Sequence, residues 1–319
     1  MIKELNFDSN IPIRSYQFYL YPLGIISANS MYASEFILNR FTNIFYGESI
    51  QYYEKPYNDW GILKVDNIFN ITRQNFIDTI INKINNGYFI HLKFINEFFL
   101  PDTLAFNKWN SKHDLLITGY DYEKKYLYTV FYNKDRIVKK YKNTFEEILN
   151  AAFYFEKNIE IECIKVNKNF SEEVDIKLII EDLKIYLSSK NPNKNVKLTP
   201  REYSYGIECY LSLSSTMKYI NDFKIGLVND VYFIYEHTKV IFDKLKYLKD
   251  KNIIENIHLD EYEKILKKAT TIKNLFVKLL ITKKEKYFNR VSDLLREFSD
   301  EENKVLTKIT NSINKKLSW

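Results

Sequence analysis

The sequence predicts an α+β protein whose N-terminal half mixes helices with strands and whose C-terminal half is helical. Segments rich in aromatic and β-branched residues cluster between residues 88 and 166, after two segments with helical spacing. From residue 171 onward, apolar residues recur every three or four positions. We therefore expect two domains, one over residues 1–167 and a helical one over residues 168–319.

Turn and capping residues delimit the elements of the N-terminal half. Pro22 and Gly24 break an aromatic, apolar segment at residues 15–23, and we expect a strand or loop there that leads into the next helix. We expect the segment 52–64 to be irregular. Thr144 and Glu147 form a capping box that begins a helix. Expected helices cover residues 31–41, 72–85 (with Thr72 as cap) and 144–154, and expected strands cover residues 88–94, 115–120, 126–132 and 159–166.

Four segments of the C-terminal half each place apolar residues on one helical stripe, namely residues 174–187, 231–248, 262–279 and 291–319. Stripes of this kind form the core of a helical bundle, and residues 200–206 form a structured link within it. The stripe of residues 231–248 either packs inside the chain or forms the contact of a homodimer.

The net charge of +6 is a mild excess, from 47 basic and 41 acidic residues. Basic clusters at residues 244–251 and 283–286 lie on predicted helices that also carry acids, which is typical of solvated helix faces. Nucleic-acid binding is a third possible function, beside the two given below, but only this mild charge supports it. We therefore expect no nucleic-acid partner. An acidic protein partner is compatible with the charge.

Several site classes lack their sequence patterns. The two cysteines, Cys163 and Cys209, have no CxxC spacing, and residues 1–10 lack the pattern of a secretory signal, so we expect a cytoplasmic protein. No apolar run reaches the roughly 18–20 residues of a membrane span. The four histidines lack HxxxH and HExxH spacing and no phosphate-binding glycine motif occurs, so we expect neither metal nor cofactor. His91 and His237 are read as packed or interfacial histidines.

The best candidate for chemistry is His113, which opens the segment HDLLITGYD at residues 113–121. A histidine at the mouth of a hairpin is held rigidly and can serve as a general base. The residue that would orient it falls near Phe131 on the returning strand, and Asn133 points to the same face of that strand. Asp121 is expected to form the turn. The alternative is a structural histidine paired with Asp114 or a backbone carbonyl.

A nucleophile for His113 would be expected where a helix begins, because the helix dipole there favours a thiolate or an oxyanion. The segment before the predicted helix 31–41 contains Ser27, Ala28 and Ser30 but no cysteine. The two serines are the available hydroxyl groups, and helix capping is their ordinary role.

Several motifs in order resemble one protein family. They are YPL at residues 21–23, NGY at 86–88, FLP at 99–101, HDLLITGYD at 113–121, YEKKYLYTVFY at 122–132 and TFEEILNAAF at 144–153. This order is similar to the N-terminal papain-like domain of butirosin H-type proteins. The C-terminal half, with YGI at 205–207 and the helix from His237 to Leu248, is similar to the helical part of relatives associated with nonribosomal peptide and polyketide clusters.

The resemblance implies a papain-like, cysteine-protease-like fold and acyl transfer from a carrier-protein thioester to an amine by a Cys-His-Asp arrangement. Under this correspondence His113 matches the base, Ala28 takes the position of the nucleophile, and Phe131 takes that of the acid. Two catalytic identities are therefore absent, whether by substitution of Ala28 or by loss of the cysteine mechanism.

Two functions in secondary metabolism follow from these expectations. The first is an acyltransferase or amide-forming enzyme that uses an acyl or peptidyl carrier protein and a small amine acceptor. In it His113 is the base, Asn133 its orienting residue, and Ser27 to Ser30 the nucleophile or oxyanion region. The second is a catalytically inactive papain-like scaffold that binds a carrier protein or a peptide intermediate.

Overall fold

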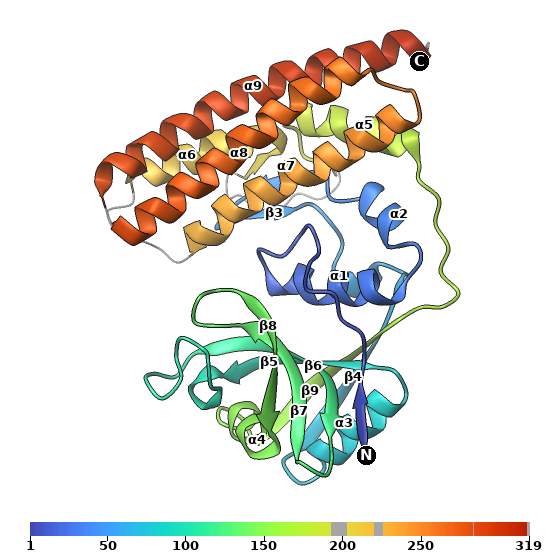
Figure 1. Cartoon of the computed structure of the whole chain (residues 1–319), viewed down its shortest axis with the longest axis vertical. Helices are drawn as coiled ribbons and strands as arrows, with labels where there is room; N and C mark the ends of the chain where they lie inside the picture. Colours follow the sequence, from blue (N-terminus) through green and yellow to red (C-terminus); the bar gives the residue numbers. More distant parts are fainter. Residues whose placement is uncertain (193–202, 220–225, 283, 318–319) are drawn as a thin grey trace. The chain divides into compact units, whose positions relative to one another are not determined.

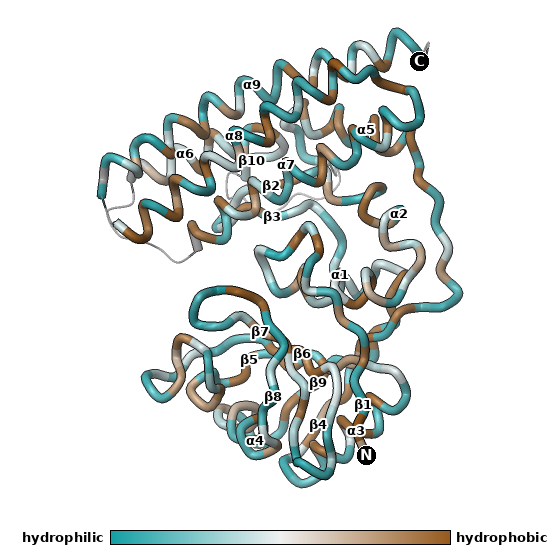
Figure 2. Tube along the Cα trace, in the orientation of Figure 1, coloured by the Kyte–Doolittle hydropathy of each residue, from teal (hydrophilic) through white to brown (hydrophobic). Residues whose placement is uncertain are grey.

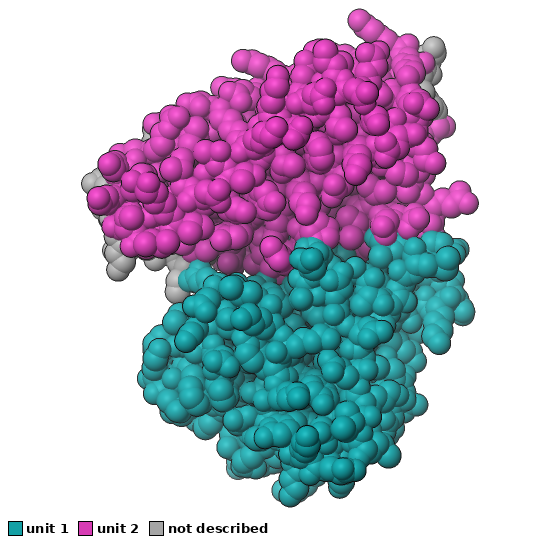
Figure 3. Space-filling view, in the orientation of Figure 1, with its two compact units in different colours: residues 1–11, 17–33, 55–171 teal, residues 12–16, 34–54, 172–319 magenta. Residues whose placement is uncertain are grey.

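The computed structural model of the 319-residue chain describes all residues except 193–202, 220–225, 283 and 318–319 (Figure 1). The chain divides into two compact units, which are shown in Figure 3. Unit 1 comprises residues 1–11, 17–33 and 55–171, and unit 2 comprises residues 12–16, 34–54 and 172–319. A single boundary after residue 167 does not describe this division, because two N-terminal segments belong to unit 2.

Unit 1 is built on a seven-stranded sheet in which the strands pair antiparallel, in the order β4-β9-β5-β6-β7-β8, with β1 added to β6. The strands are β1 (Ile2–Glu4), β4 (Leu63–Thr72), β5 (Phe89–Asn96), β6 (Lys112–Asp121), β7 (Tyr126–Tyr132), β8 (Val138–Thr144) and β9 (Asn158–Val166). The predicted hairpin of β6 and β7 is confirmed, and so are the strands near 88–94 and 159–166. Strands β1, β4 and β8 were not anticipated.

One face of this sheet carries the hydrophobic core of unit 1. Ile90 and Leu92 of β5 lie in one buried cluster with residues of α3 (Phe76–Asn85) and α4 (Phe145–Ala152). The predicted capping box of α4 is confirmed: the Thr144 hydroxyl accepts from the Glu147 amide, and the Glu147 carboxylate accepts from the Thr144 amide. Thr72 ends β4 and does not cap α3, whose N-cap is Asn75.

Helix α1 (Gln17–Asn29) replaces the strand or loop expected around Pro22 and Gly24. Every residue from Tyr19 to Ile26 is buried, so the helix is apolar on all sides and gains packing around its whole circumference. The packing of these residues compensates for the helix hydrogen bond that is missing at Pro22, which has no backbone N–H. The helix expected over residues 31–41 is correspondingly shorter, and only α2 (Ala33–Leu38) forms there.

Unit 2 is largely helical, and its long helices α7, α8 and α9 pack side by side (Figure 1). Its described elements are α2, α5 (Ile176–Ser188), α6 (Cys209–Tyr219), α7 (Gly226–Asp250), α8 (Asn256–Thr282), α9 (Glu285–Leu317), and a small sheet of β2 (Ile44–Tyr46), β3 (Ile50–Tyr52) and β10 (Ser204–Tyr205). Part of the link expected over residues 200–206 lies outside the described residues. Three short 3-10 helices complete the two units, η1 (Tyr57–Asp59), η2 (Glu97–Phe99) and η3 (Gly206–Glu208).

Apolar stripes account for the packing of these helices. Figure 2 shows apolar and polar positions alternating along α7, α8 and α9. On α7, the stripe residues Val231, Ile234, Ile241, Leu245 and Leu248 are almost fully buried, so the stripe belongs to the core of unit 2. Among the described residues, no helix combines the length and apolar character needed to cross a membrane.

Candidate functional site

His113 lies beside an irregularity in the sheet of unit 1. Its strand β6 pairs with β5, and the register of this pair shifts between Leu92 and Ile95, where Ile95 faces His113. Phe94 in this bulge has a positive φ of 58°, and its amide donates to Asp114 Oδ1 at 3.3 Å. Bulges re-aim neighbouring side chains and are common beside functional sites.

The bulge is followed by Glu97 of η2, which faces His113. The His113 Nδ1 and Glu97 Oε1 atoms lie 3.9 Å apart, and the side chains are 38% and 12% exposed, respectively. Nδ1 of His113 is buried and forms no hydrogen bond with any described residue. The exposed part of the ring is therefore the side that carries Nε2. Burial raises the pKa of Glu97, and the charge of His113 opposes that rise. The pair therefore has the composition of a base with an orienting acid.

Asn133, predicted to orient His113, is engaged in a turn instead. Its Oδ1 atom accepts from the amide of Asp135 at 2.9 Å and from that of Ile137 at 2.8 Å. The oxygen that would receive the imidazole proton is thus already occupied by the connection between β7 and β8. Phe131, at the expected acid position, is buried and stacks on Tyr141 with ring centroids 4.3 Å apart.

The expected nucleophile region also lies in a different setting. Ser27 and Ala28 belong to the last turn of α1, and the next helix, α2, begins only at Ala33. The Ser27 hydroxyl donates to Asp8 Oδ2 at 2.7 Å, and the Ser30 hydroxyl accepts from the Tyr32 amide at 3.2 Å. The C-terminal end of a helix carries the negative end of its dipole, which disfavours a thiolate or an oxyanion. The prediction of a helix N-terminus at this position was wrong.

A second cluster on the same sheet was missed from the sequence and centres on His91. Its Nδ1 atom lies 2.9 Å from Glu162 Oε2, and its Nε2 atom lies 3.3 Å from Asp114 Oδ2. The Tyr57 hydroxyl donates to Glu162 and lies 3.1 Å from His91 Nδ1. Lys93 Nζ donates to Glu162 Oε1 at 2.5 Å.

The charges of this cluster stabilise one another. Hydrogen bonds and charge interactions with Asp114 and Glu162 raise the pKa of His91 despite burial, which alone would lower it. Burial alone would raise the pKa of Glu162, but hydrogen bonds from His91, Lys93 and Tyr57 together lower it to about 2. The arrangement is a buried histidine between two carboxylates, and both carboxylates favour the protonated form of its ring.

Asp114 connects the two groups. Its carboxylate contacts His91 and holds the Phe94 bulge, while the adjacent residue is His113. The pairing of His91 with Glu162 comes from the register of β5 and β9, in which these two residues face each other. Alternation places His91 and Lys93 on one face of β5, but the partner strand cannot be identified from local sequence.

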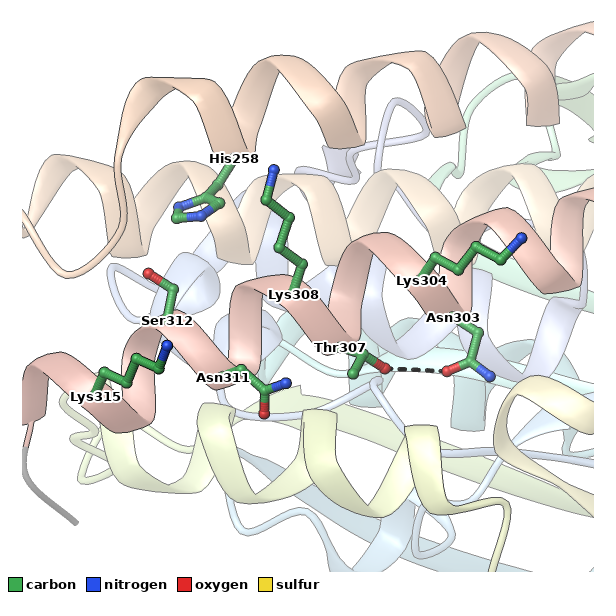
Figure 4. Close-up of a pocket in the computed structure, with 8 residues that line it drawn as sticks. All are labelled: His258, Asn303, Lys304, Thr307, Lys308, Asn311, Ser312 and Lys315. Carbon is green, nitrogen blue, oxygen red and sulfur yellow. Dashed lines mark hydrogen bonds between the residues drawn. The ribbon is translucent and has the colours of Figure 1, made fainter.

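Unit 2 contains an open groove along α9, of about 730 Å³, shown in Figure 4. Its lining consists of His258, Asn303, Lys304, Thr307, Lys308, Asn311, Ser312 and Lys315. Lys308 is paired with Glu261 at 2.5 Å, and the Thr307 hydroxyl donates to Asn303 at 3.2 Å. The lining is polar and basic and contains no acid that could complete an acid–base pair.

The described residues hold no group of three or more His, Cys, Asp or Glu side chains arranged for a metal ion. No protein-family model matches this chain, and no curated protein matches it.

Proposed function

We propose that unit 1 is a papain-like domain that transfers an acyl or peptidyl group from a carrier-protein thioester to a small amine, with His113 as general base. The observation that supports this most is the pairing of the half-exposed His113 with the partly buried Glu97, at 3.9 Å between Nδ1 and Oε1. In this assignment Glu97, and not Asn133, orients the imidazole. Placement of HDLLITGYD on β6 of an antiparallel sheet, with α1 in the same unit, is consistent with the resemblance.

The proposed reaction needs no covalent enzyme intermediate. The amine nitrogen attacks the thioester carbonyl carbon and its proton passes to His113 Nε2. The C–S bond then breaks, the carrier thiolate leaves and takes a proton from the imidazolium, and an amide remains. Glu97 stabilises the imidazolium during this step. Because a thioester is already activated, positioning of the amine supplies much of the acceleration.

His113→Ala is expected to slow this aminolysis by about 10²- to 10⁴-fold, the usual contribution of a positioned general base. The measurement is a single-turnover assay with acylated carrier proteins and a panel of amines. The matched control is His258→Ala in unit 2, which should leave the rate unchanged. Equal rates for His113→Ala and the unmodified protein would contradict the assignment of His113.

A second function, an inactive scaffold that binds a carrier protein or peptide intermediate, is favoured by the state of the possible nucleophiles. The Ser27 hydroxyl is held by Asp8, and burial raises the pKa of the Cys163 thiol to about 11. The second thiol, Cys209, is also buried. Stoichiometric binding of an acylated carrier protein, with no acyl transfer to any amine tested, would favour this function over the first.

A further inference from the structure

Unit 2 contains a continuous chain of hydrogen bonds that the proposed function does not use. It runs from Glu302 of α9 through Tyr186 of α5 and Tyr210 of α6 to His237 of α7. All four residues are 0% exposed and lie in the core of this unit. Glu302 Oε2 lies 2.7 Å from the Tyr186 hydroxyl, which lies 2.9 Å from that of Tyr210, which lies 2.9 Å from His237 Nδ1.

The number of protons in this chain follows from its two ends. His237 Nε2 lies 2.8 Å from the carbonyl oxygen of Thr42, which can only accept, so Nε2 carries a proton. If His237 is neutral, Nδ1 must accept from Tyr210, and Tyr210 in turn must accept from Tyr186. The Tyr186 hydroxyl then donates its single hydrogen to Tyr210. It can bond to Glu302 only as an acceptor, so the carboxyl group of Glu302 must carry a proton.

The alternative arrangement has a Glu302 carboxylate and a doubly protonated His237, with every hydroxyl of the chain reversed. It places a positive charge on a fully buried ring, on the same helix as the buried Lys244. Burial and the charge of Lys244 both lower the pKa of His237, to about 4. The neutral arrangement is therefore the stable one.

The surroundings of Glu302 offer hydroxyl groups in place of a cation. Tyr186, Tyr210 and Tyr262 reach it from α5, α6 and α8, and Tyr262 donates to its second oxygen, Oε1. Burial raises the pKa of Glu302 to about 7, against the lowering effect of these three hydroxyls. The titratable groups of the neighbouring helices include Cys209 on α6, which is buried, and Lys268 on α8, which is paired with Glu297 and Glu301 of α9.

We infer that Glu302 holds its proton in the folded protein and donates it to Tyr186, at the head of the hydrogen-bond chain through Tyr210 to a neutral His237, which makes unit 2 a pH-sensitive element. When Glu302 loses this proton to solvent, Tyr186 turns its hydroxyl to the new carboxylate, and one bond of the chain is lost. A negative charge then lies buried among aromatic rings. Unit 2 loosens as a result, and it does so independently of any activity in unit 1.

The sign of the pH dependence follows from the raised pKa of this acid. Between about pH 4.3 and about pH 7, the unfolded state has released the proton that the folded state keeps. The unfolding equilibrium constant therefore rises by up to about tenfold per pH unit in this window, and the effect levels off above it.

The test compares the full-length protein with Glu302→Gln by urea unfolding between pH 5 and pH 8, with hydrogen exchange read on α5 and α9. Glutamine can donate to Tyr186 and accept from Tyr262 without titrating, so this component of the pH dependence should vanish. Glu301→Gln on the exposed side of α9 is the matched control and should follow the unmodified protein. A pH dependence in Glu302→Gln equal to that of the unmodified protein overturns the inference.

A second measurement decides the question if Glu302→Gln does not fold. Infrared spectroscopy of the unmodified protein should show a protonated carboxyl band that titrates near neutral pH. Tyr262→Phe removes a hydroxyl that stabilises the carboxylate, so the same band should persist to higher pH. A band that does not respond to this substitution means that it does not arise from Glu302, and the inference fails.

Discussion

Glu162→Ala is expected to reduce the unfolding free energy of unit 1 by about 3–5 kcal/mol, because it breaks a buried ion pair by removing one partner. His91 would keep only Asp114 as a carboxylate neighbour, and the buried Tyr57 hydroxyl would lose its acceptor. The measurement is urea unfolding of the full-length protein at pH 6. Glu160→Ala is the matched control, since Glu160 is an exposed acid of the same strand and should change stability little.

The same cluster predicts a pH window. The pKa of Glu162 is lowered in the folded state to about 2, so its contribution is present above its unfolded value near 4.3 and is lost as pH falls through 2. The pKa of His91 is raised, so its contribution is present below about 6.5 and is lost as pH rises through the folded value. In Glu162→Ala, the unfolding free energy should fall less steeply between about pH 4.3 and pH 2 than in the unmodified protein. An equally steep fall in both would contradict the cluster's role.

The second large effect is expected for Lys244→Met in unit 2. Lys244 is fully buried, and its Nζ atom donates to the carbonyl oxygen of Leu38 and to that of Arg40 at 2.6 Å, with that of Ile37 at 3.4 Å. These carbonyls lie at the C-terminal end of α2, where helix carbonyls lack intrahelical donors. Methionine fills a similar volume but removes the donor to the carbonyls of Leu38 and Arg40, at about 1–3 kcal/mol for each buried group, while the Ile37 carbonyl keeps the Arg40 amide as a donor at 3.2 Å.

Lys246→Met is the matched control for this substitution, because Lys246 is an exposed lysine of the same helix. Burial lowers the pKa of Lys244 to about 7, so the unmodified protein should gain stability from about pH 7 towards pH 10, where only the unfolded state keeps that proton. Lys244→Met should lose this gain. Equal stability of the two methionine variants at pH 7 would show that the carbonyls have found other donors.

The local sequence pattern correctly predicted much of the fold. It failed where tertiary packing determines the secondary structure. The β6–β7 hairpin and the capping box at Thr144 depend on neighbouring residues and were predicted correctly. Helix α1 was missed because Pro22 and Gly24 normally interrupt helices, and burial from Tyr19 to Ile26 overrides that preference. Segments 12–16 and 34–54 belong to unit 2, and no local signal could have indicated this.

The residues of the candidate site also differ in whether the sequence alone could identify them. His113 was identified by its position at the start of a strand, and the structure places it there. Its acidic neighbour Glu97 was not identified, because it reaches His113 across a bulge whose register is a property of paired strands. The His91–Glu162 pair was missed for a related reason: the two residues are 71 positions apart in sequence.

The most direct test of the proposed function is a double-mutant cycle on His113 and Glu97, measured as single-turnover aminolysis of an acylated carrier protein. If Glu97 acts through His113, Glu97→Gln alone slows the reaction, while the double variant is no slower than His113→Ala alone. Asp102→Asn, an exposed acid five residues further along the chain, should leave the rate unchanged. Losses that add in the double variant, or a Glu97→Gln rate equal to that of the unmodified protein, would contradict the account.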